Sequence, residues 1–256
     1  MSYLPSFRLD DKVALVTGAS RGLGEHIAGG LAEAGARVVG VARDEQALNK
    51  LADGLGAAGL QFTPMPGDVS DLKGLGALVA DVERRVGPIE ILVNNAGTNI
   101  QQDAVDVDEV SWDKVLDLNL KSVFFLSQAV GRRMIALGTR GRIINIASQI
   151  GEVGFYKRSA YAASKGGLVH MSKVMALEWA PNGIRVNCVG PTFIDSPLAR
   201  KMFEDQAIAD EVMRKIPIQR LGKASEVASA VVYLASEGAD LVTGHHLLVD
   251  GGWTAQ

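Results

Sequence analysis

A tyrosine and a lysine stand four residues apart in the segment 161–165, which reads YAASK and opens a helix-patterned stretch. Positions i and i+4 share one helical face about one turn apart, so Tyr161 and Lys165 should lie together. Lowering the pKa of a phenol from about 10 to about 7 needs roughly 4 kcal/mol of extra phenolate stabilisation. One positive charge about 4 Å away supplies roughly that much at an effective dielectric constant near 20. The spacing predicts a tyrosine that exchanges protons near neutral pH.

Two other polar residues could support that tyrosine. Ser148 follows an apolar run that reads as a strand, and its hydroxyl could orient a substrate oxygen, although a serine there is commonly a turn cap. Asn119 interrupts an apolar helical stretch, where it could simply satisfy a bent helix backbone. Tyrosine and lysine four apart also occur by chance in amphipathic helices. The chemical prediction therefore depends on Ser148 lying at the same sheet edge as Tyr161.

A glycine-rich turn, TGASRGLG at residues 17–24, follows the first strand-like run of the chain. Glycines let a backbone approach a pyrophosphate, and the start of the following helix offers free N–H groups and partial positive charge. It could be an ordinary strand-to-helix turn, but its place after the first strand favours a nucleotide. The predicted contacts are Gly18, Ser20, Arg21, Gly22, Leu23 and Gly24.

The end of the second strand predicts which dinucleotide binds. A site selective for NAD(H) usually carries a carboxylate there, whereas this strand ends in Ala42 and Arg43. Arg43 and Arg21 would place two guanidiniums near the adenosine ribose, which favours a 2′-phosphate. The alternative is that both are solvated surface charges. We predict NADP(H) in preference to NAD(H).

The elements that must position these residues alternate along the chain. Strands are predicted at 12–17, 37–42, 61–66, 89–93, 142–147, 184–189 and 246–249. Helices are predicted at 22–34, 45–55, from a cap at Ser70 to 86, and at 110–137, 159–180, 198–215 and 224–236. This order predicts an α/β fold, a single Rossmann-type doubly wound domain over 1–256. Its sheet should have seven strands, mainly parallel, with helices on both faces.

One segment departs from that alternation and has the character of a lid. Residues 192–222 are long and polar, and Pro197 and Pro217 interrupt them. A segment of this kind beyond the strand ends is a candidate substrate lid within the domain.

Composition limits the partners and the compartment. The 256 residues carry a net charge of −3, so no basic field attracts nucleic acid, and the apolar runs are too short to span a bilayer. The single cysteine, Cys188, is expected to be an inert core thiol, and no signal-peptide pattern opens the chain. We expect a cytoplasmic protein with a small-molecule substrate and no nucleic-acid or membrane partner. The four histidines lack metal-ligand spacing, which predicts no metal.

The glycine loop, the stretch NNAG at 94–97, Ser148 and the YxxxK motif occur in the order of the short-chain dehydrogenase/reductase family, which the chain resembles over its whole length. The resemblance implies an oxidoreductase that moves a hydride between NADP(H) and an alcohol or ketone. It implies four catalytic residues, namely Asn119, Ser148, Tyr161 and Lys165. In the family the asparagine holds a water that connects the lysine to solvent, and the lysine also bonds the nicotinamide ribose.

The resemblance adds cofactor contacts that the residue types alone do not give. They are Asp68, Val69, Asn95, Ala96, Gly97, Tyr161, Lys165, Pro191, Ile194 and Ser196. Asp68 could equally be a turn residue that caps the region of Ser70. Thr192 replaces the glycine usual after the proline, which leaves open how closely the backbone approaches the nicotinamide. The C-terminal stretch 242–253 resembles the family's terminal strand and implies a homotetramer.

Within the family the chain is similar to sugar-acid and polyol enzymes such as gluconate and deoxygluconate dehydrogenases, while ketoacyl, steroid or other small carbonyl substrates stay open. Candidate substrate contacts are Gln149, Glu152, Tyr156, Lys157 and Arg158. Lys157 and Arg158 could meet a carboxylate, but we expect them to be solvated loop charges. The rival functions are a non-catalytic NADP(H)-binding regulator, which would be expected to lose the tyrosine or lysine, and an epimerase or dehydratase, which usually has a longer chain.

Overall fold

Seven strands form one sheet in the part of the chain that the structure describes, in the order β3-β2-β1-β4-β5-β6-β7. The computed structural model describes residues 3–255, without the side chains of Pro197 and Leu198. Every strand pair is parallel. The strands are β1 (Val13–Thr17), β2 (Arg37–Ala42), β3 (Phe62–Pro66), β4 (Ile91–Asn94), β5 (Arg142–Ile146), β6 (Arg185–Pro191) and β7 (His246–Val249). The predicted doubly wound fold is confirmed, and the sheet is wholly parallel.

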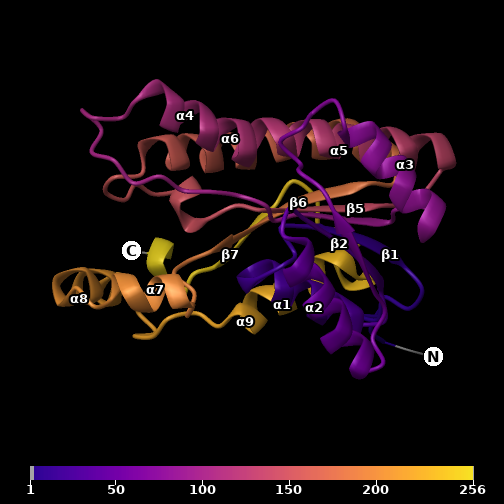
Figure 1. The fold of residues 1–256 in the computed structure, drawn as a ribbon, viewed down its shortest axis with the longest axis horizontal. Coiled ribbons are helices and arrows are strands. Elements are labelled where there is room, and N and C mark those ends of the chain that lie inside the picture. Colours follow the sequence, from indigo (N-terminus) through magenta and orange to yellow (C-terminus); the bar gives the residue numbers. More distant parts are fainter. Residues whose placement is uncertain (1–2, 256) are drawn as a thin grey trace.

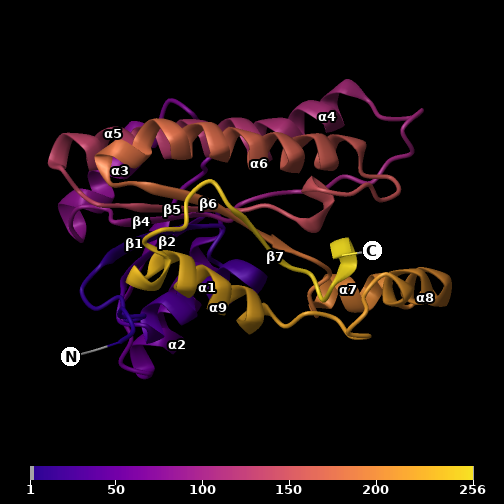
Figure 2. The ribbon, with the colours of Figure 1, turned by 180° about the vertical axis from the view of Figure 1, so that it is seen from behind.

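Helices cover both faces of the sheet (Figures 1 and 2). One face carries α1 (Gly22–Glu33), α2 (Glu45–Ala57) and α9 (Ala224–Ala235). The other carries α3 (Leu75–Arg85), α4 (Glu109–Leu116), α5 (Ser122–Leu137) and α6 (Ser159–Trp179). Side chains therefore leave each central strand into two apolar cores: Ala14 and Val16 pack in one, Leu15 in the other. This is why the strands read as continuous apolar runs rather than alternating ones.

Three predicted helices differ in the structure, and one of them, at 198–215, is divided into two shorter helices because the side chain of Asp205 caps a second helix that begins at Gln206. Ser70 does not cap α3, because that helix begins at Leu75 after Gly74, and Ser70 instead donates to the carboxylate of Asp68. The predicted helix 110–137 is two helices, α4 and α5, joined by a π-helical turn at Asp117–Lys121. Such turns often occur at functional sites.

The segment 192–222 contains two short helices, α7 (Pro197–Met202) and α8 (Gln206–Arg214). They project beyond the end of the sheet, near the C-terminus (Figure 1). An isolated bridge between Ile194 and Gly222 holds the two ends of the segment together, and Val212 and Ile216 pack in an apolar cluster with Trp253 near the C-terminus. Its position beyond the strand ends fits the predicted lid, and its movement stays a prediction.

A buried polar chain ties the middle of the sheet to the helices above it. The amide of Asn94 donates to Ser127 at 2.9 Å and to Asn145 at 2.8 Å, and Asn145 donates to Ser172 at 2.8 Å. Buried polar groups that are fully paired hold neighbouring elements in one register. Asn94, the first residue of NNAG, thus has a structural role. No helix within residues 3–255 is long and apolar enough to cross a membrane.

Candidate active site

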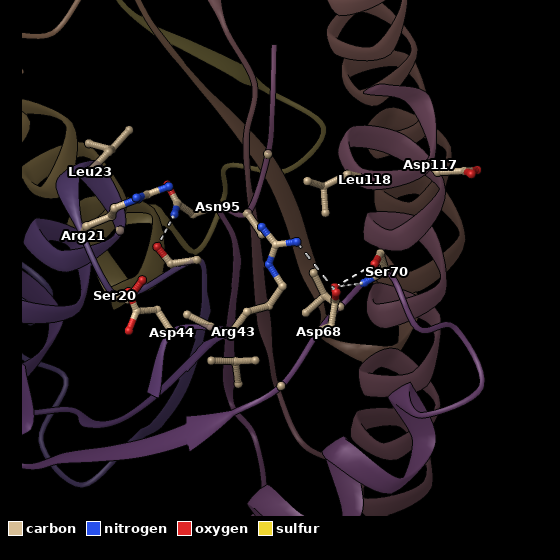
Figure 3. A pocket seen from close by; sticks show the side chains of 18 of the residues that line it. Ser20, Arg21, Leu23, Arg43, Asp44, Asp68, Ser70, Asn95, Asp117 and Leu118 are labelled. Atoms are coloured by element: carbon tan, nitrogen blue, oxygen red, sulfur yellow. Dashed lines mark hydrogen bonds and ion pairs between the residues drawn. The ribbon is translucent and has the colours of Figure 1, made fainter. Parts of the chain in front are cut away.

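The carboxyl ends of the central strands meet at one edge of the sheet and open onto a cavity of about 680 Å³ (Figure 3). In open α/β sheets this edge, where the strand order reverses, is where ligands bind. Eleven of the predicted cofactor contacts line the cavity: Gly18, Ser20, Arg21, Leu23, Gly24, Arg43, Asp68, Val69, Asn95, Ala96 and Gly97. The structure thus brings together four segments that are far apart in the sequence.

The glycine turn has the shape that a pyrophosphate needs. Gly18 and Gly22 adopt left-handed backbone angles, with φ of 65° and 59°. A Cβ on Gly24 would lie 2.1 Å from the carbonyl oxygen of Gly18, so only glycine fits there. Helix α1 has no side-chain cap on its N-terminal N–H groups, whereas Asp44 caps α2 and Asp108 caps α4. These free donors and the close turn fit a dinucleotide phosphate.

Charges of both signs line the cavity where β2 and β3 end. The guanidinium of Arg43 lies 4.0 Å from the carboxylate of Asp68, with 79% of the Arg43 side chain exposed (Figure 3). Asp68 also accepts hydrogen bonds from the amide and hydroxyl of Ser70, which are the main reason that its pKa is lowered. The alternative turn role of Asp68 therefore holds. Arg21 is exposed on the opposite wall, in the glycine turn.

Sequence reasoning missed one wall of the cavity. Asp117 and Leu118, from the π-helical turn, lie across from the glycine turn (Figure 3), and Lys114 from α4 also lines the cavity. Their spacing of three and four residues, just before Asn119, is a signal that could have found them. The other residues missed are Val41, Ala42, Asp44, Gly67 and Ser70. Asp44 faces the cavity with its carboxylate occupied by the amide of Ala47, at 3.0 Å.

Six predicted contacts are not among the described residues that line this cavity: Gly22, Tyr161, Lys165, Pro191, Ile194 and Ser196. Pro191 is buried at the end of β6, and the hydroxyl of Ser196 caps α7. Thr192, which follows Pro191, buries a hydroxyl oxygen that has no hydrogen-bond partner within the described residues. Contacts between these six residues and a cofactor stay predictions.

Lys165 and Tyr161 share one helical turn at the start of α6. The ammonium of Lys165, however, is not paired with the hydroxyl of Tyr161 as expected. The ammonium of Lys165 lies 5.6 Å from the centroid of the Tyr161 ring and donates to the carbonyl of Ile146 at 2.6 Å. Burial lowers the pKa of Lys165 to about 8. Burial also raises the pKa of Tyr161, although a hydrogen bond with Ser148 and the charge of Arg158 oppose this. In the protein alone, the predicted lowering of the tyrosine pKa is wrong, because desolvation outweighs the nearby charges.

Ser148 stands at the end of β5 with only 6% of its surface exposed. Its hydroxyl donates to the side chain of Gln149 at 2.8 Å and accepts from the amide of Ile150 at 3.2 Å. It therefore caps the short turn Gln149–Gly151, as the alternative interpretation of the sequence allowed, and its hydroxyl acts to lower the pKa of the nearby Tyr161 phenol. The hydroxyl that could orient a substrate is held at the sheet edge by this turn.

Asn119 lies in the π-helical turn and is fully buried. Its side chain accepts from the amide of Thr98 at 2.8 Å, donates to the Thr98 carbonyl at 2.8 Å, and donates to Ser164 at 3.1 Å. These bonds join the segment after NNAG to the helix that carries Tyr161 and Lys165. The widened turn gives Asn119 this reach, and the proton-relay water that the family implies stays a prediction.

The remaining candidates divide between core and surface. Burial raises the pKa of Cys188 to about 11, which keeps the thiol protonated, as expected of a core residue. Lys157 is exposed and pairs with Asp103 at 3.3 Å, as expected of a loop charge. Arg158 is only 7% exposed, so its expected solvation is wrong. Within residues 3–255 no three His, Cys, Asp or Glu side chains gather as metal ligands would.

Comparison with known proteins places the chain among oxidoreductases. The profile of a family described as enoyl-(acyl carrier protein) reductase matches residues 18–254. A 2-dehydro-3-deoxy-D-gluconate 5-dehydrogenase of Dickeya dadantii is 39% identical over 255 residues, which cover 99% of each chain. An NAD-dependent glycerol dehydrogenase of Listeria innocua is 37% identical, over 97% of this chain and 96% of its own.

Solved structures give the same result in three dimensions. The crystal structure of a gluconate 5-dehydrogenase from Burkholderia cenocepacia, in complex with NADP and tartrate, superposes with a TM-score of 0.94. The two chains are 38% identical, and the match covers 100% of both. The fold is therefore shared with a protein whose crystal structure contains NADP.

The buried ammonium of Lys165 should destabilise the fold. A pKa of about 8 in place of 10.5 means that burial penalises the charged form by about 3 kcal/mol at neutral pH. Lys165→Met removes this penalty and loses one hydrogen bond, worth about 1 kcal/mol. We expect a gain of about 2 kcal/mol in the free energy of unfolding at pH 7, measured by urea denaturation without cofactor.

The same gain should disappear at high pH. Below pH 8 the lysine is charged in both the folded and the unfolded protein, so the penalty is complete. Between pH 8 and 10.5 the folded protein loses the proton first, and the difference between variant and wild type should shrink towards zero. A gain that is as large at pH 10 as at pH 7 would show that the ammonium is not the destabilising group.

Proposed function

The chain belongs to the short-chain dehydrogenase/reductase family, and we propose that it is an NADP(H)-dependent oxidoreductase that interconverts a secondary alcohol and a ketone. We propose a sugar, sugar acid or polyol as the substrate class, because relatives that match nearly the whole chain are named for such substrates. The observation that carries the proposal is the juxtaposition of Tyr161 with Ser148 and Lys165 at the carboxyl edge of the sheet, beside a cavity with a glycine turn suited to phosphate.

In this proposal Tyr161 is the general acid and base. When a ketone is reduced, the phenol donates its proton to the substrate oxygen, and when an alcohol is oxidised the phenolate takes that proton. Ser148 donates a hydrogen bond to the same oxygen and keeps it in line with the phenol. A bound nicotinamide nucleotide supplies or accepts the hydride at the neighbouring carbon. The proton and the hydride together balance the change between ketone and alcohol.

Because the pKa of Tyr161 is raised in the protein alone, reduction of a ketone and oxidation of an alcohol place different demands on this residue. A protonated phenol is ready to act as an acid at neutral pH. To act as a base near pH 7, it needs at least about 4 kcal/mol of added phenolate stabilisation. Lys165 can contribute part of this, because its ammonium lies one helical turn away in surroundings of low dielectric. The positive ring of an oxidised nicotinamide would contribute more.

Tyr161→Phe tests the proposed chemistry. The change removes the exchangeable proton and keeps the ring, so we expect kcat to fall by about a thousandfold or more while the dissociation constant for NADPH stays within about threefold. Turnover is followed at the nicotinamide absorbance and binding by nicotinamide fluorescence. Tyr3→Phe, at an exposed tyrosine outside the candidate site, is the matched control and should keep full activity. Substantial activity in Tyr161→Phe would exclude the phenol as the proton-transfer group.

We further propose that the protein prefers NADP(H) to NAD(H). Support comes from Arg43 and Arg21, which line the cavity, and from the bound NADP in the Burkholderia relative. The Listeria relative is described as NAD-dependent, so family membership alone does not decide the preference. The Arg43 guanidinium is ion-paired only weakly, at 4.0 Å from Asp68, and could turn towards a 2′-phosphate.

Removing the two guanidiniums should reverse the preference. In Arg21→Ala/Arg43→Ala we expect kcat/KM with NADP(H) to fall by about a hundredfold, because two charge-assisted contacts to the phosphate are lost. With NAD(H) the value should change by less than about threefold, since NAD lacks that phosphate. Steady-state kinetics with both cofactors gives the ratio. A wild-type preference for NAD(H) would contradict the proposal directly.

We propose a homotetramer in the cytoplasm as the working state. Large apolar side chains stay exposed on α5 and α6, as a buried interface between subunits would require. They are Phe125, Ile135, Leu137, Val174 and Leu177. The single cysteine is buried and free, which suits a reducing compartment.

A further inference from the structure

Arg158 is a buried charge next to the proposed proton-transfer residue. It precedes α6, three residues before Tyr161, and only 7% of its surface is exposed. Its guanidinium lies 4.8 Å from the ring centroid of Phe155 and 5.6 Å from that of Phe193. Burial lowers its pKa, but an arginine stays charged at neutral pH. The apolar stem and planar head are thus held between aromatic rings at the edge of the site.

The hydrogen-bonding capacity of this guanidinium is largely unused. It has five N–H donors, and one of its terminal nitrogens donates to the carbonyl of Tyr156 at 3.2 Å. No carboxylate within residues 3–255 lies within 4.0 Å of it. Arg142, another little-exposed arginine, is by contrast paired with Asp240. Because burying an unpaired charge is costly, the site of Arg158 favours an anion that comes from outside the chain.

The surroundings place that anion at the substrate end of the site. Phe155 follows the turn that Ser148 caps, and Phe193 follows the end of β6, so the guanidinium lies between two segments of the candidate active site. Its charge reaches the phenol of Tyr161, whose pKa it lowers. Thr192, next to Phe193, holds a buried hydroxyl without a hydrogen-bond partner in the described residues. A ligand with both a carboxylate and hydroxyl groups would suit the guanidinium of Arg158 and this buried hydroxyl.

We propose that Arg158 binds the carboxylate of a sugar-acid substrate and makes the protein select hydroxy acids over uncharged polyols of the same carbon skeleton. The inference rests on the proposed function and names its substrate class. A guanidinium and a carboxylate form two parallel charge-assisted hydrogen bonds, which are stronger where water is excluded. A polyol leaves the guanidinium unpaired, and a site built for a polar group rejects analogues that lack it by large factors. Arg158 is then a specificity-determining residue rather than a proton donor.

A pair of substrates that differ only at one end tests this inference. D-Gluconate and D-glucitol share one carbon chain, with a carboxylate in the first where the second has a hydroxymethyl group. With NADP⁺, wild-type kcat/KM should favour gluconate by about a hundredfold or more. Arg158→Met keeps an apolar stem against Phe155 and Phe193. It should lose about a hundredfold on gluconate, mainly through KM, and change by less than about threefold on glucitol.

Two further variants separate recognition from a structural role. Lys157→Met removes the neighbouring exposed charge and should leave both substrates unchanged. Arg158→Lys keeps the charge but not the planar pair of donors, so it should recover part of the gluconate activity. Equal losses on gluconate and glucitol in Arg158→Met, together with a fall in the melting temperature, would show that the arginine only supports the fold and would overturn the inference.

Binding measurements keep this test separate from that of the proposed function. Calorimetric titration of the NADP⁺-loaded protein with gluconate and with glucitol needs no turnover. Tighter binding of gluconate that Arg158→Met removes would support the inference, even if neither compound is oxidised and the proposed reaction fails. Equal binding of the two compounds, or gluconate binding that Arg158→Met leaves intact, would overturn the inference whatever the activity.

Discussion

Burial of two ionisable side chains at the edge of the sheet is the constraint on which the rest of the site depends. Tyr161 and Lys165 lie where water is scarce, so the charged form of each is disfavoured: the pKa of the phenol rises and that of the ammonium falls to about 8. The two pKa values move apart: that of the ammonium comes closer to neutral pH, while the phenol is held in its protonated form.

The fold supplies what this burial requires. The carbonyl of Ile146, at the end of β5, receives the Lys165 ammonium and keeps it paired. The turn capped by Ser148 starts two residues further along, and Asn119 holds the opposite segment through both backbone groups of Thr98. A sheet buried on both faces by helices provides enough apolar core to tolerate a penalty of about 3 kcal/mol at one lysine. The order of strands places all of these ends on one edge.

Much of this arrangement could be predicted from the sequence, because it depends on local patterns. Strand periodicity gave β2 and β7 at their observed bounds, and the glycine spacing identified the cavity wall around Gly18 and Gly24. What could not be predicted depends on tertiary contacts. The π-helical turn arises where Asn119 bonds Thr98, 21 residues away, and the burial of Arg158 depends on Phe193, which a loop brings from β6. The sequence predicts the wrong direction for the pKa shift of Tyr161. Helical spacing reveals a neighbouring charge, but it does not reveal that the phenol is removed from water.

The central claim is that the phenol of Tyr161 is protonated by burial in the protein alone and becomes acidic when a positive nicotinamide lies beside it. A pH titration followed by NMR, with tyrosines labelled with ¹³C at Cζ, measures this pKa directly. The chain has four tyrosines, and the signal of Tyr161 is the one that is missing in Tyr161→Phe. Without cofactor, the Tyr161 signal should titrate above the ordinary value of about 10, and saturation with NADP⁺ should bring its pKa down by at least about one unit. An unshifted titration near 10 that is the same with and without NADP⁺ would contradict the account.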